Sequence, residues 1–295
     1  MLFELQKCKR MRKALLLIWI FVTLSGVSQY SKVMDSLTLT SKILGGERKY
    51  AIYLPPDYET SKRKYPVLYL LHGSGDDQAG WVQFGDVLQI TDKAIENGLA
   101  TPMIIVMPDA QSGQKGYFNS FDGEWNYETF FFDEFVPFIE KKYRIRSEKR
   151  FRAIAGLSMG GGGAFIYALR HPEMFSSACP LSGVMGELSY DEFYKKNEAT
   201  LKELRRETVY NYYSNHNALS IIKNQTDANL KSVKWYIDCG DDDFLFEGNS
   251  MVHVALKKRG IPHEYRVRDG SHNWTYWRGS LPKVLAFISD YFRQK

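Results

Sequence analysis

Short apolar segments alternate with amphipathic segments along most of this chain. From Leu37 onward, runs rich in β-branched and aromatic residues have the length of single strands and are bounded by polar turns. The strand-like runs are Tyr50–Leu54, Val67–Leu71, Met103–Met107, Phe151–Ala155, Ala178–Leu181, Val233–Ile237 and Tyr265–Val267. The helical patterns between most of them are Val87–Asn97, Thr129–Tyr143, Gly161–Arg170, Met251–Lys258 and Leu281–Phe292. This alternation predicts an α/β fold, in which helices cover both faces of a mostly parallel sheet.

Two segments depart from this regular pattern. Leu37–Thr40 and Lys49–Leu54 flank two consecutive glycines at positions 45 and 46, which predicts an antiparallel hairpin at the edge of the sheet. Residues 184–231 are polar, charged and rich in Tyr and Asn, which predicts a partly helical insertion over one end of the sheet. This insertion is either a solvated excursion or a lid over a substrate cleft. No repeat or low-complexity linker interrupts the chain, so residues 29–295 are predicted to form a single domain.

The N-terminal residues form a pattern of their own. A basic patch ends at Lys13, an apolar run of 11 residues from Ala14 to Leu24 follows, broken by Thr23, and small residues continue to Ser28. This layout is typical of a secretory signal peptide. The run is shorter than the roughly 20 residues that span a membrane, so no permanent membrane span is expected. We expect residues 1–28 to be removed and the mature chain to be exported to a periplasm or the cell exterior.

Charge and cysteine content limit the possible partners. The chain has 39 Lys and Arg residues and 34 Asp and Glu residues. Five of the cations and one of the anions lie in the first 28 residues, so residues 29–295, the body of the chain, have 34 cations and 33 anions. A nearly neutral body gives no reason to expect a nucleic acid or an anionic membrane surface as partner. Cys179 and Cys239 lie in strand-like runs, without His or Cys at metal-ligand spacing. They are expected to be buried free thiols, although an oxidising compartment would allow a single bridge between them, and no metal site is predicted.

The strongest local motif surrounds Ser158. Residues 156–160 are Gly-Leu-Ser-Met-Gly, which follow a strand-like run and begin a helical stretch. A Gly-x-Ser-x-Gly motif in this context holds its serine on a strained turn, where the glycines leave room for the adjoining strand and helix. A glycine-rich phosphate cradle is the alternative, but no Lys-Ser or Lys-Thr pair follows the glycines and the dinucleotide-binding spacing is missing. Ser158 is therefore the candidate nucleophile.

A serine nucleophile needs a base, and the base needs a carboxylate that orients it. His272 follows the last predicted strand, and loops at the carboxyl ends of parallel strands are where such sheets place their sites. The strand Val233–Ile237 leads into three consecutive aspartates at positions 241–243, each of which is a candidate acid. Their spacing does not choose between them. The predicted order along the chain is Ser158, one of these aspartates, then His272.

An oxyanion hole requires two backbone N–H groups aimed at the developing negative charge. Met159 directly follows the candidate nucleophile and is expected to supply one of them. The turn of residues 72–75, His-Gly-Ser-Gly, follows the strand Val67–Leu71, and Ser74 is expected to supply the second. His72 is interpreted as a support for this turn.

Four segments taken together, LLHGSGDD, GLSMGGGGA, CGDDDFL and DGSHNW, resemble the secreted α/β-hydrolase esterases of carbohydrate esterase family 1. That family includes feruloyl and acetylxylan esterases, and S-formylglutathione hydrolases and mycolyltransferases are related to it. The resemblance extends from about Ser36 to the end of the chain. It implies the α/β-hydrolase fold and a triad of Ser158, Asp243 and His272 that needs no cofactor. Asp243 is chosen by the resemblance alone, as the third residue after the Cys-Gly pair.

The resemblance also implies hydrolysis of carboxylic esters through an acyl-enzyme, with feruloyl or acetyl groups on plant polysaccharide as the expected substrates. Four tryptophans near predicted loops are candidates for stacking on a sugar or an aromatic acyl group, although aromatic residues more often belong to the core: Trp81, Trp125, Trp274 and Trp277. A general short-chain carboxylesterase of the S-formylglutathione hydrolase type is an alternative function. A second alternative is a binding protein with the hydrolase fold but without catalysis; such proteins characteristically lose the nucleophile or the base, and this chain retains both residue types.

Overall fold

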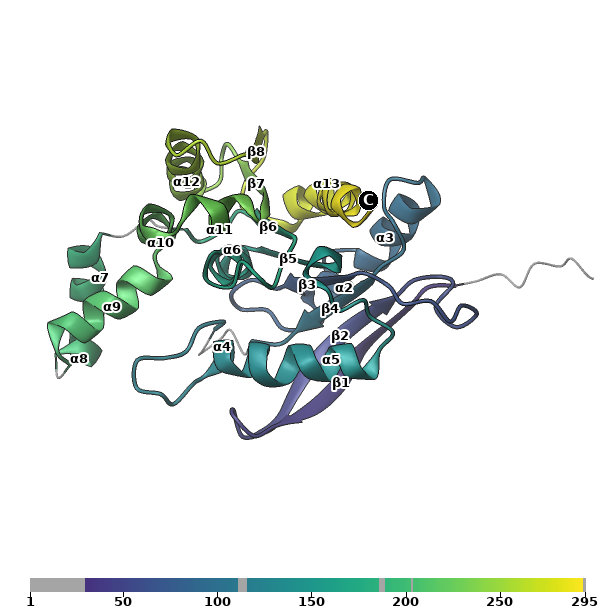
Figure 1. The fold of residues 1–295 in the computed structure, drawn as a ribbon, viewed down its shortest axis with the longest axis horizontal. Coiled ribbons are helices and arrows are strands. Elements are labelled where there is room, and N and C mark those ends of the chain that lie inside the picture. Colours follow the sequence, from purple (N-terminus) through teal and green to yellow (C-terminus); the bar gives the residue numbers. More distant parts are fainter. Residues whose placement is uncertain (1–29, 111–115, 186–188, 203, 294–295) are drawn as a thin grey trace, which may run out of the picture. The chain divides into compact units, whose positions relative to one another are not determined.

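An eight-stranded sheet organises the described part of the computed structural model, which comprises residues 30–110, 116–185, 189–202 and 204–293. The signal peptide expected at residues 1–28 lies outside these residues. The spatial order is β1-β2-β4-β3-β5-β6-β7-β8 (Figure 1). The strands are β1 Lys32–Ser41, β2 Gly46–Leu54, β3 Val67–Leu71, β4 Ile104–Pro108, β5 Arg152–Leu157, β6 Ser177–Leu181, β7 Lys234–Gly240 and β8 His263–Arg268.

The strand directions confirm the fold predicted from the sequence. β1 pairs with β2 and β2 with β4 in antiparallel fashion, and the remaining pairs from β4 to β8 are parallel. The antiparallel hairpin therefore lies at the sheet edge, as expected. Every residue of β3, β4, β5 and β6 is buried, as is usual for parallel strands with helices on both faces. The sheet and its helices form the α/β-hydrolase arrangement.

Helices cover the sheet on both faces, and each face has its own apolar cluster. One face carries α2 Gly80–Gln83, α3 Val87–Glu96 and α13 Trp274–Arg293, and α3 and α13 lie side by side (Figure 1). The other face carries α4 Tyr127–Phe130, the π-helical turn Phe131–Phe135, α5 Val136–Lys142, α6 Met159–Arg170 and α12 Phe246–Lys258. The single helix expected at Thr129–Tyr143 is thus a run of three helical pieces. A short 3₁₀ turn, Lys149–Phe151, precedes β5. Cys179 and Cys239 are buried thiols within β6 and β7.

The described residues of segment 184–231 form five short helices, which are α7 Tyr190–Lys196, α8 Glu198–Leu201, α9 Arg206–His216, α10 Ala218–Asn224 and α11 Asp227–Lys231. The second half of this segment belongs to the core, because Ile221, Ile222 and Leu230 join the cluster around α6 and α12. The first half is more exposed, and no residue of α7 is buried. The segment is therefore not one uniform excursion. Its role as a lid stays a prediction.

Glu128 in α4 connects α6 and α9 to the core. Its buried carboxylate accepts hydrogen bonds from Arg170 at 2.9 Å and from His171 at 3.2 Å, and it lies 3.8 Å from His216. Burial alone would raise the pKa of Glu128. The hydrogen bond from His171, the proximity of His216 and the charge of Arg170 together outweigh burial and lower this pKa to about 2.

The glycines on either side of Ser158 allow three backbone segments to approach closely. A Cβ atom added at Gly156 would lie 2.4 Å from the carbonyl oxygen of Gly160. A Cβ atom added at Gly160 would lie 2.5 Å from the carbonyl oxygen of His72. Because the obstructing atoms are backbone, no rotation of a side chain relieves these contacts.

We expect Glu128→Gln to lower the free energy of unfolding by about 2 kcal/mol at pH 7, since it removes a buried charge that three partners stabilise. The folded-state pKa is depressed, so this stabilisation is present above the ordinary carboxyl pKa near 4.5 and is lost as the pH falls towards 2. Urea unfolding of both proteins between pH 2 and pH 7 measures the difference. Glu173→Gln is the matched control, because this exposed carboxylate lies 3.6 Å from the same His171 and should matter little. A difference that did not change with pH would contradict the interpretation.

We expect Gly160→Ala to destabilise the fold by at least about 2 kcal/mol, because the new methyl group would overlap backbone atoms of the turn after β3. Gly279→Ala is the control, since Gly279 is exposed within α13 and its added Cβ meets nothing closer than Arg268 at 3.8 Å. This second change should stabilise the protein by about 0.5–1 kcal/mol through the higher helix propensity of alanine. Equal effects of the two changes in thermal unfolding would show that close packing at Gly160 is not the cause.

Candidate active site

Ser158 lies on the turn between β5 and α6. Its φ of 53° and ψ of −120° are rare for a residue other than glycine. Its N–H donates to Leu181 O in β6 at 2.9 Å, and its carbonyl oxygen accepts from Gly162 and Val184 at 3.0 and 3.1 Å. These backbone bonds hold the strained turn at the carboxyl end of the parallel strands.

The three side chains expected to form a triad lie together. His272 Nε2 is 3.0 Å from Ser158 Oγ, and His272 Nδ1 is 3.0 and 2.9 Å from the two carboxylate oxygens of Asp243. Because Nδ1 faces a carboxylate, the ring carries its proton on Nδ1 when neutral. Nε2 is then an acceptor for the Ser158 hydroxyl. The Asp243 side chain is fully buried, whereas that of His272 is 17% exposed. This arrangement can transfer a proton from serine to imidazole.

Asp243 is held by more groups than the sequence indicated. Its Oδ1 accepts from the N–H of Leu245 at 2.8 Å. The Ser182 hydroxyl oxygen accepts a hydrogen bond from the indole N–H of Trp277 at 3.1 Å. The hydroxyl proton of Ser182 is then available to donate to Asp243. Burial raises the pKa of Asp243, but the hydrogen bonds from His272, Ser182 and Leu245 outweigh it and lower the pKa. Sequence reasoning missed Ser182; its position directly after β6 was the available signal.

The loop that carries His272 is anchored at both ends by Asp238. This fully buried carboxylate in β7 accepts from Arg268, before the loop, at 2.9 Å and from the hydroxyl of Tyr276, after it. Tyr236 donates to it at 3.0 Å. Sequence reasoning also missed Asp238. Its partners come close to it only when β7 pairs with β8, and no sequence motif indicates that contact.

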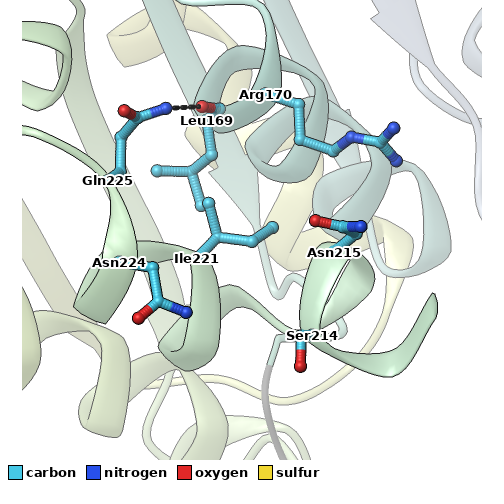
Figure 2. A pocket seen from close by; sticks show the side chains of 7 residues that line it. All are labelled: Leu169, Arg170, Ser214, Asn215, Ile221, Asn224 and Gln225. Atoms are coloured by element: carbon cyan, nitrogen blue, oxygen red, sulfur yellow. Dashed lines mark hydrogen bonds between the residues drawn. The ribbon is translucent and has the colours of Figure 1, made fainter. Parts of the chain in front are cut away.

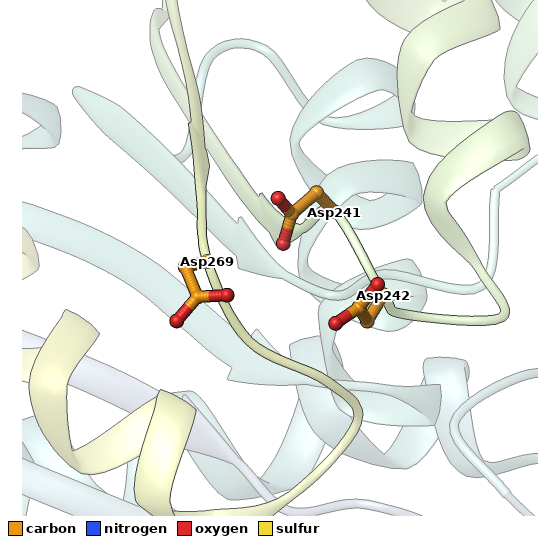
Figure 3. A group of neighbouring side chains, drawn as sticks. All are labelled: Asp241, Asp242 and Asp269. Atoms are coloured by element: carbon orange, nitrogen blue, oxygen red, sulfur yellow. The ribbon is translucent and has the colours of Figure 1, made fainter.

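The other two candidate acids do not contact His272. Asp241 and Asp242 are exposed and form a cluster with Asp269, in which carboxylate oxygens lie within 4.8 Å of one another (Figure 3). Asp241 accepts from the N–H of Gly270 at 3.1 Å, so it closes the loop before His272. Exposed carboxylates of this kind are common on protein surfaces, and the cluster alone gives no reason to assign a metal.

Two segments expected to supply backbone N–H groups lie next to Ser158. Met159 is the first residue of α6, where an N–H has no partner within the helix. The turn after β3 approaches closely, because a Cβ added at Gly73 would lie 3.5 Å from Ser158 Cβ. Ser74 follows in this turn and is exposed. The structure thus brings both segments expected to form an oxyanion hole to Ser158.

His72 supports this turn from within the core. Its Nε2 accepts from the N–H of Ala110 at 3.0 Å, which places the ring proton on Nδ1, and Nδ1 lies 2.9 Å from the carbonyl oxygen of Gly73. Burial lowers the pKa of His72, which favours the neutral ring. Tyr117 bonds both the N–H and the carbonyl of His72 through its hydroxyl. The interpretation of His72 as a support agrees with these contacts.

The tryptophans considered for substrate stacking differ in exposure. Trp81 is fully buried and donates to Leu71 O at 3.0 Å, and Trp125 is buried and donates to Gly116 O at 2.7 Å. Both are therefore corrected to core positions, since no face of either ring is open to a substrate. Trp274 is partly exposed and packs edge to face on Trp81. Trp277 is buried and packs on His272 with its ring edge.

A polar pocket of about 320 Å³ lies apart from this site, between the ends of α6, α9 and α10 (Figure 2). Two of its polar side chains are engaged within the protein, whereas the buried hydroxyl of Ser214 has no hydrogen-bond partner among the described residues. The Arg170 guanidinium pairs with Glu128, and the Gln225 amide donates to Leu169 O at 3.2 Å. No residue of the Ser158–His272–Asp243 group lines it, so it is not the candidate active site.

Comparison with known proteins assigns the family. The Esterase family model matches residues 41–288. An esterase of Mycobacterium tuberculosis is 32% identical over 243 residues, which cover 75% of this chain and 51% of that protein. An endo-1,4-beta-xylanase/feruloyl esterase of Xylanibacter ruminicola is 30% identical over 266 residues, which cover 86% of this chain and 31% of that protein. The chain thus spans about half the length, or less, of these two relatives.

A solved structure of a ferulic acid esterase superposes with a TM-score of 0.78 and 39% sequence identity, covering 89% of this chain and 99% of that chain. The S-formylglutathione hydrolase of Staphylococcus aureus superposes with a TM-score of 0.70 at 20% identity, covering 88% and 99%, which shows a shared fold. The resemblance noted in the sequence is therefore confirmed. On its family match and its fold, the chain belongs to the Esterase family of α/β-hydrolases.

Proposed function

We propose that this chain is a serine esterase that hydrolyses carboxylic esters through an acyl-enzyme. The hydrogen-bonded series from Ser158 through His272 to Asp243 carries the proposal, because it places a nucleophile, a base and an orienting carboxylate in reacting order. Membership of the Esterase family supports it. A binding protein without catalysis would have no need for this complete and strained arrangement.

In the first step, Ser158 Oγ attacks the carbonyl carbon of the ester while His272 Nε2 accepts its proton. Negative charge develops on the carbonyl oxygen, and the backbone N–H groups of Ser74 and Met159 stabilise it. The ionised Asp243 stabilises the imidazolium. His272 then donates its proton to the oxygen of the leaving alcohol, the ester C–O bond breaks, and the acyl group stays on Ser158.

In the second step, water attacks the acyl carbon while His272 accepts a proton from the water. The tetrahedral intermediate uses the same backbone N–H groups. His272 returns the proton to Ser158 Oγ as the carboxylic acid leaves. Every transferred proton stays within the triad and the reactants, so this mechanism uses no cofactor.

Feruloyl or acetyl groups on plant polysaccharide are the proposed substrates. The 39% identity to a ferulic acid esterase over nearly all of that chain supports this class, as does the similarity to a protein named as both xylanase and feruloyl esterase. A general short-chain carboxylesterase is the second candidate, and the S-formylglutathione hydrolase neighbour favours it. The two candidates differ in which alcohol and acyl groups are accepted.

Export is part of the proposal. The basic patch, the short apolar run and the small residues before position 29 support removal of residues 1–28 and release into a periplasm or the cell exterior. Within residues 30–293, apart from the gaps named above, no helix combines the length and the apolar character needed to cross a membrane.

We expect the mature chain to release product from p-nitrophenyl acetate, methyl ferulate and acetylated xylan, and Ser158→Ala to lower kcat by at least about 10³-fold on each. The variant should keep its thermal stability, because among the described residues the Ser158 hydroxyl hydrogen-bonds with His272 and the turn is held by backbone bonds. Activity on p-nitrophenyl acetate alone would favour the short-chain carboxylesterase. Hydrolysis by Ser158→Ala above about 1% of the original rate would remove Ser158 as nucleophile.

We expect Asp243→Asn to lower kcat by about 10³–10⁴-fold, since an amide neither fixes the Nδ1–H tautomer of His272 nor stabilises the imidazolium. Asp242→Asn is the matched control, because Asp242 is the adjacent residue and is exposed. It should retain kcat within about twofold. The measurement is hydrolysis of p-nitrophenyl acetate at pH 7–8. A large loss for Asp242→Asn with little for Asp243→Asn would reverse the assignment of the acid.

A further inference from the structure

Phe244 is an exposed aromatic residue in contact with the base. It directly follows Asp243 and leaves 76% of its surface accessible, although it is a large apolar side chain. Its ring centroid lies 4.5 Å from that of the His272 imidazole, with an angle of 49° between the rings. A single exposed apolar residue is ordinary on a protein surface, but one that packs on a catalytic imidazole borders the reacting groups.

The backbone around Phe244 directs this ring outward. Both neighbours, Asp243 and Leu245, are buried, and the N–H of Leu245 donates to Asp243 Oδ1 at 2.8 Å. This bond closes a tight turn whose two ends point into the protein, so the residue between them points away. The position of Phe244 is therefore set by the same turn that sets the acid.

The other sides of the His272 ring are already occupied. Its Nδ1 faces Asp243 and its Nε2 faces Ser158, while the ring of Trp277 packs against it at 4.9 Å from within the protein. Phe244 thus packs on the imidazole where this ring is partly exposed to solvent.

The reaction determines which part of an ester lies next to Phe244. The carbonyl oxygen must face the N–H groups of Ser74 and Met159, whereas the alcohol oxygen must lie within reach of His272 Nε2 to receive its proton. A ring that packs on His272 and is open to solvent therefore borders the alcohol part of the ester. The apolar C–H face of a sugar ring can pack on such an aromatic face and bury part of it.

We propose that Phe244 determines selectivity for the alcohol part of the ester and favours esters of sugars over esters of small alcohols. This inference rests on the proposed esterase function and adds to it a residue that acts in the acylation step alone. The alcohol leaves when the acyl-enzyme forms, so Phe244 has no partner during deacylation. A residue that merely positioned His272 would affect both steps, because His272 transfers a proton in each.

The test compares esters that share an acyl group and differ in the alcohol. Methyl ferulate is paired with feruloyl arabinose, and ethyl acetate with an acetylated xylose. The variants are Phe244→Ala, Phe244→Tyr and, as a control, Leu99→Ala, which removes an exposed apolar side chain beside the C-terminal end of α13. Phe244→Ala should lower kcat/KM at least about 10-fold more for the sugar ester than for the small ester of either pair. Phe244→Tyr should retain the selectivity, and Leu99→Ala should change neither ester.

Single-turnover measurements complete the test. The breakdown rate of the feruloyl-enzyme formed from p-nitrophenyl ferulate should be the same in wild type and Phe244→Ala. Equal losses on both esters of a pair, or slowed deacylation, would show that Phe244 only positions His272 and would overturn the proposal. Unchanged kcat/KM on all esters would overturn it as well. If the wild-type chain hydrolysed none of these esters, the proposed function itself would fail, and this inference with it.

Discussion

Ser158 is held in a backbone conformation that costs a residue with a side chain about 1–3 kcal/mol, and neighbouring segments leave it no alternative. β6 accepts its N–H, while α6 and the segment after β6 donate to its carbonyl oxygen. The glycines at 156 and 160 allow β3 and its following turn to come within contact distance of the same backbone. The turn that exposes the nucleophile is thus also the point at which β3, β5, β6 and α6 meet. A change that relaxed it would move the segments expected to form the oxyanion hole together with the serine.

The charged part of the site is organised around two buried carboxylates with different tasks. Asp238 pairs with Arg268 and Tyr276, which fixes both ends of the loop that carries His272. Asp243 faces the imidazole and is kept ionised by hydrogen bonds that outweigh its burial. A buried carboxylate with too few partners would take up a proton and release its neighbour. In the proposed mechanism, the supporting bonds of Asp243 maintain a charge near neutral pH, and those of Asp238 fix the loop that carries the base.

The sequence predicted the parts of the fold whose signals are local. Apolar runs located β3 to β8 because parallel strands are buried on both faces, and the two glycines located the edge hairpin. The predicted first residues of the helices were less accurate. α13 begins at Trp274 and not at Leu281. Gly279 and Pro282 give this segment a weak helix propensity, but burial of Tyr276 and Trp277 outweighs it. Sequence motifs predicted the order of the triad residues along the chain, which is Ser158, an aspartate and then His272. The choice of Asp243 depended on resemblance, because three adjacent aspartates differ only in where a turn directs them.

Residues whose roles depend on distant partners were not accessible in this way. The indole N–H groups of Trp81 and Trp125 are satisfied by carbonyl oxygens of other segments, so these rings are core residues despite their loop context. Phe244 shows the reverse case, since its apolar character suggests burial and its turn keeps it outside. The buried carboxylate of Asp243 and the strained backbone of Ser158 are each held by several hydrogen bonds, whereas the exposed ring of Phe244 packs on His272 alone among the described aromatic rings. Because a mostly exposed ring contributes little to the core, the proposed alcohol side of the site can change in evolution at small cost to stability. Changes at Ser158, Asp243 or His272 would instead remove the proposed reaction.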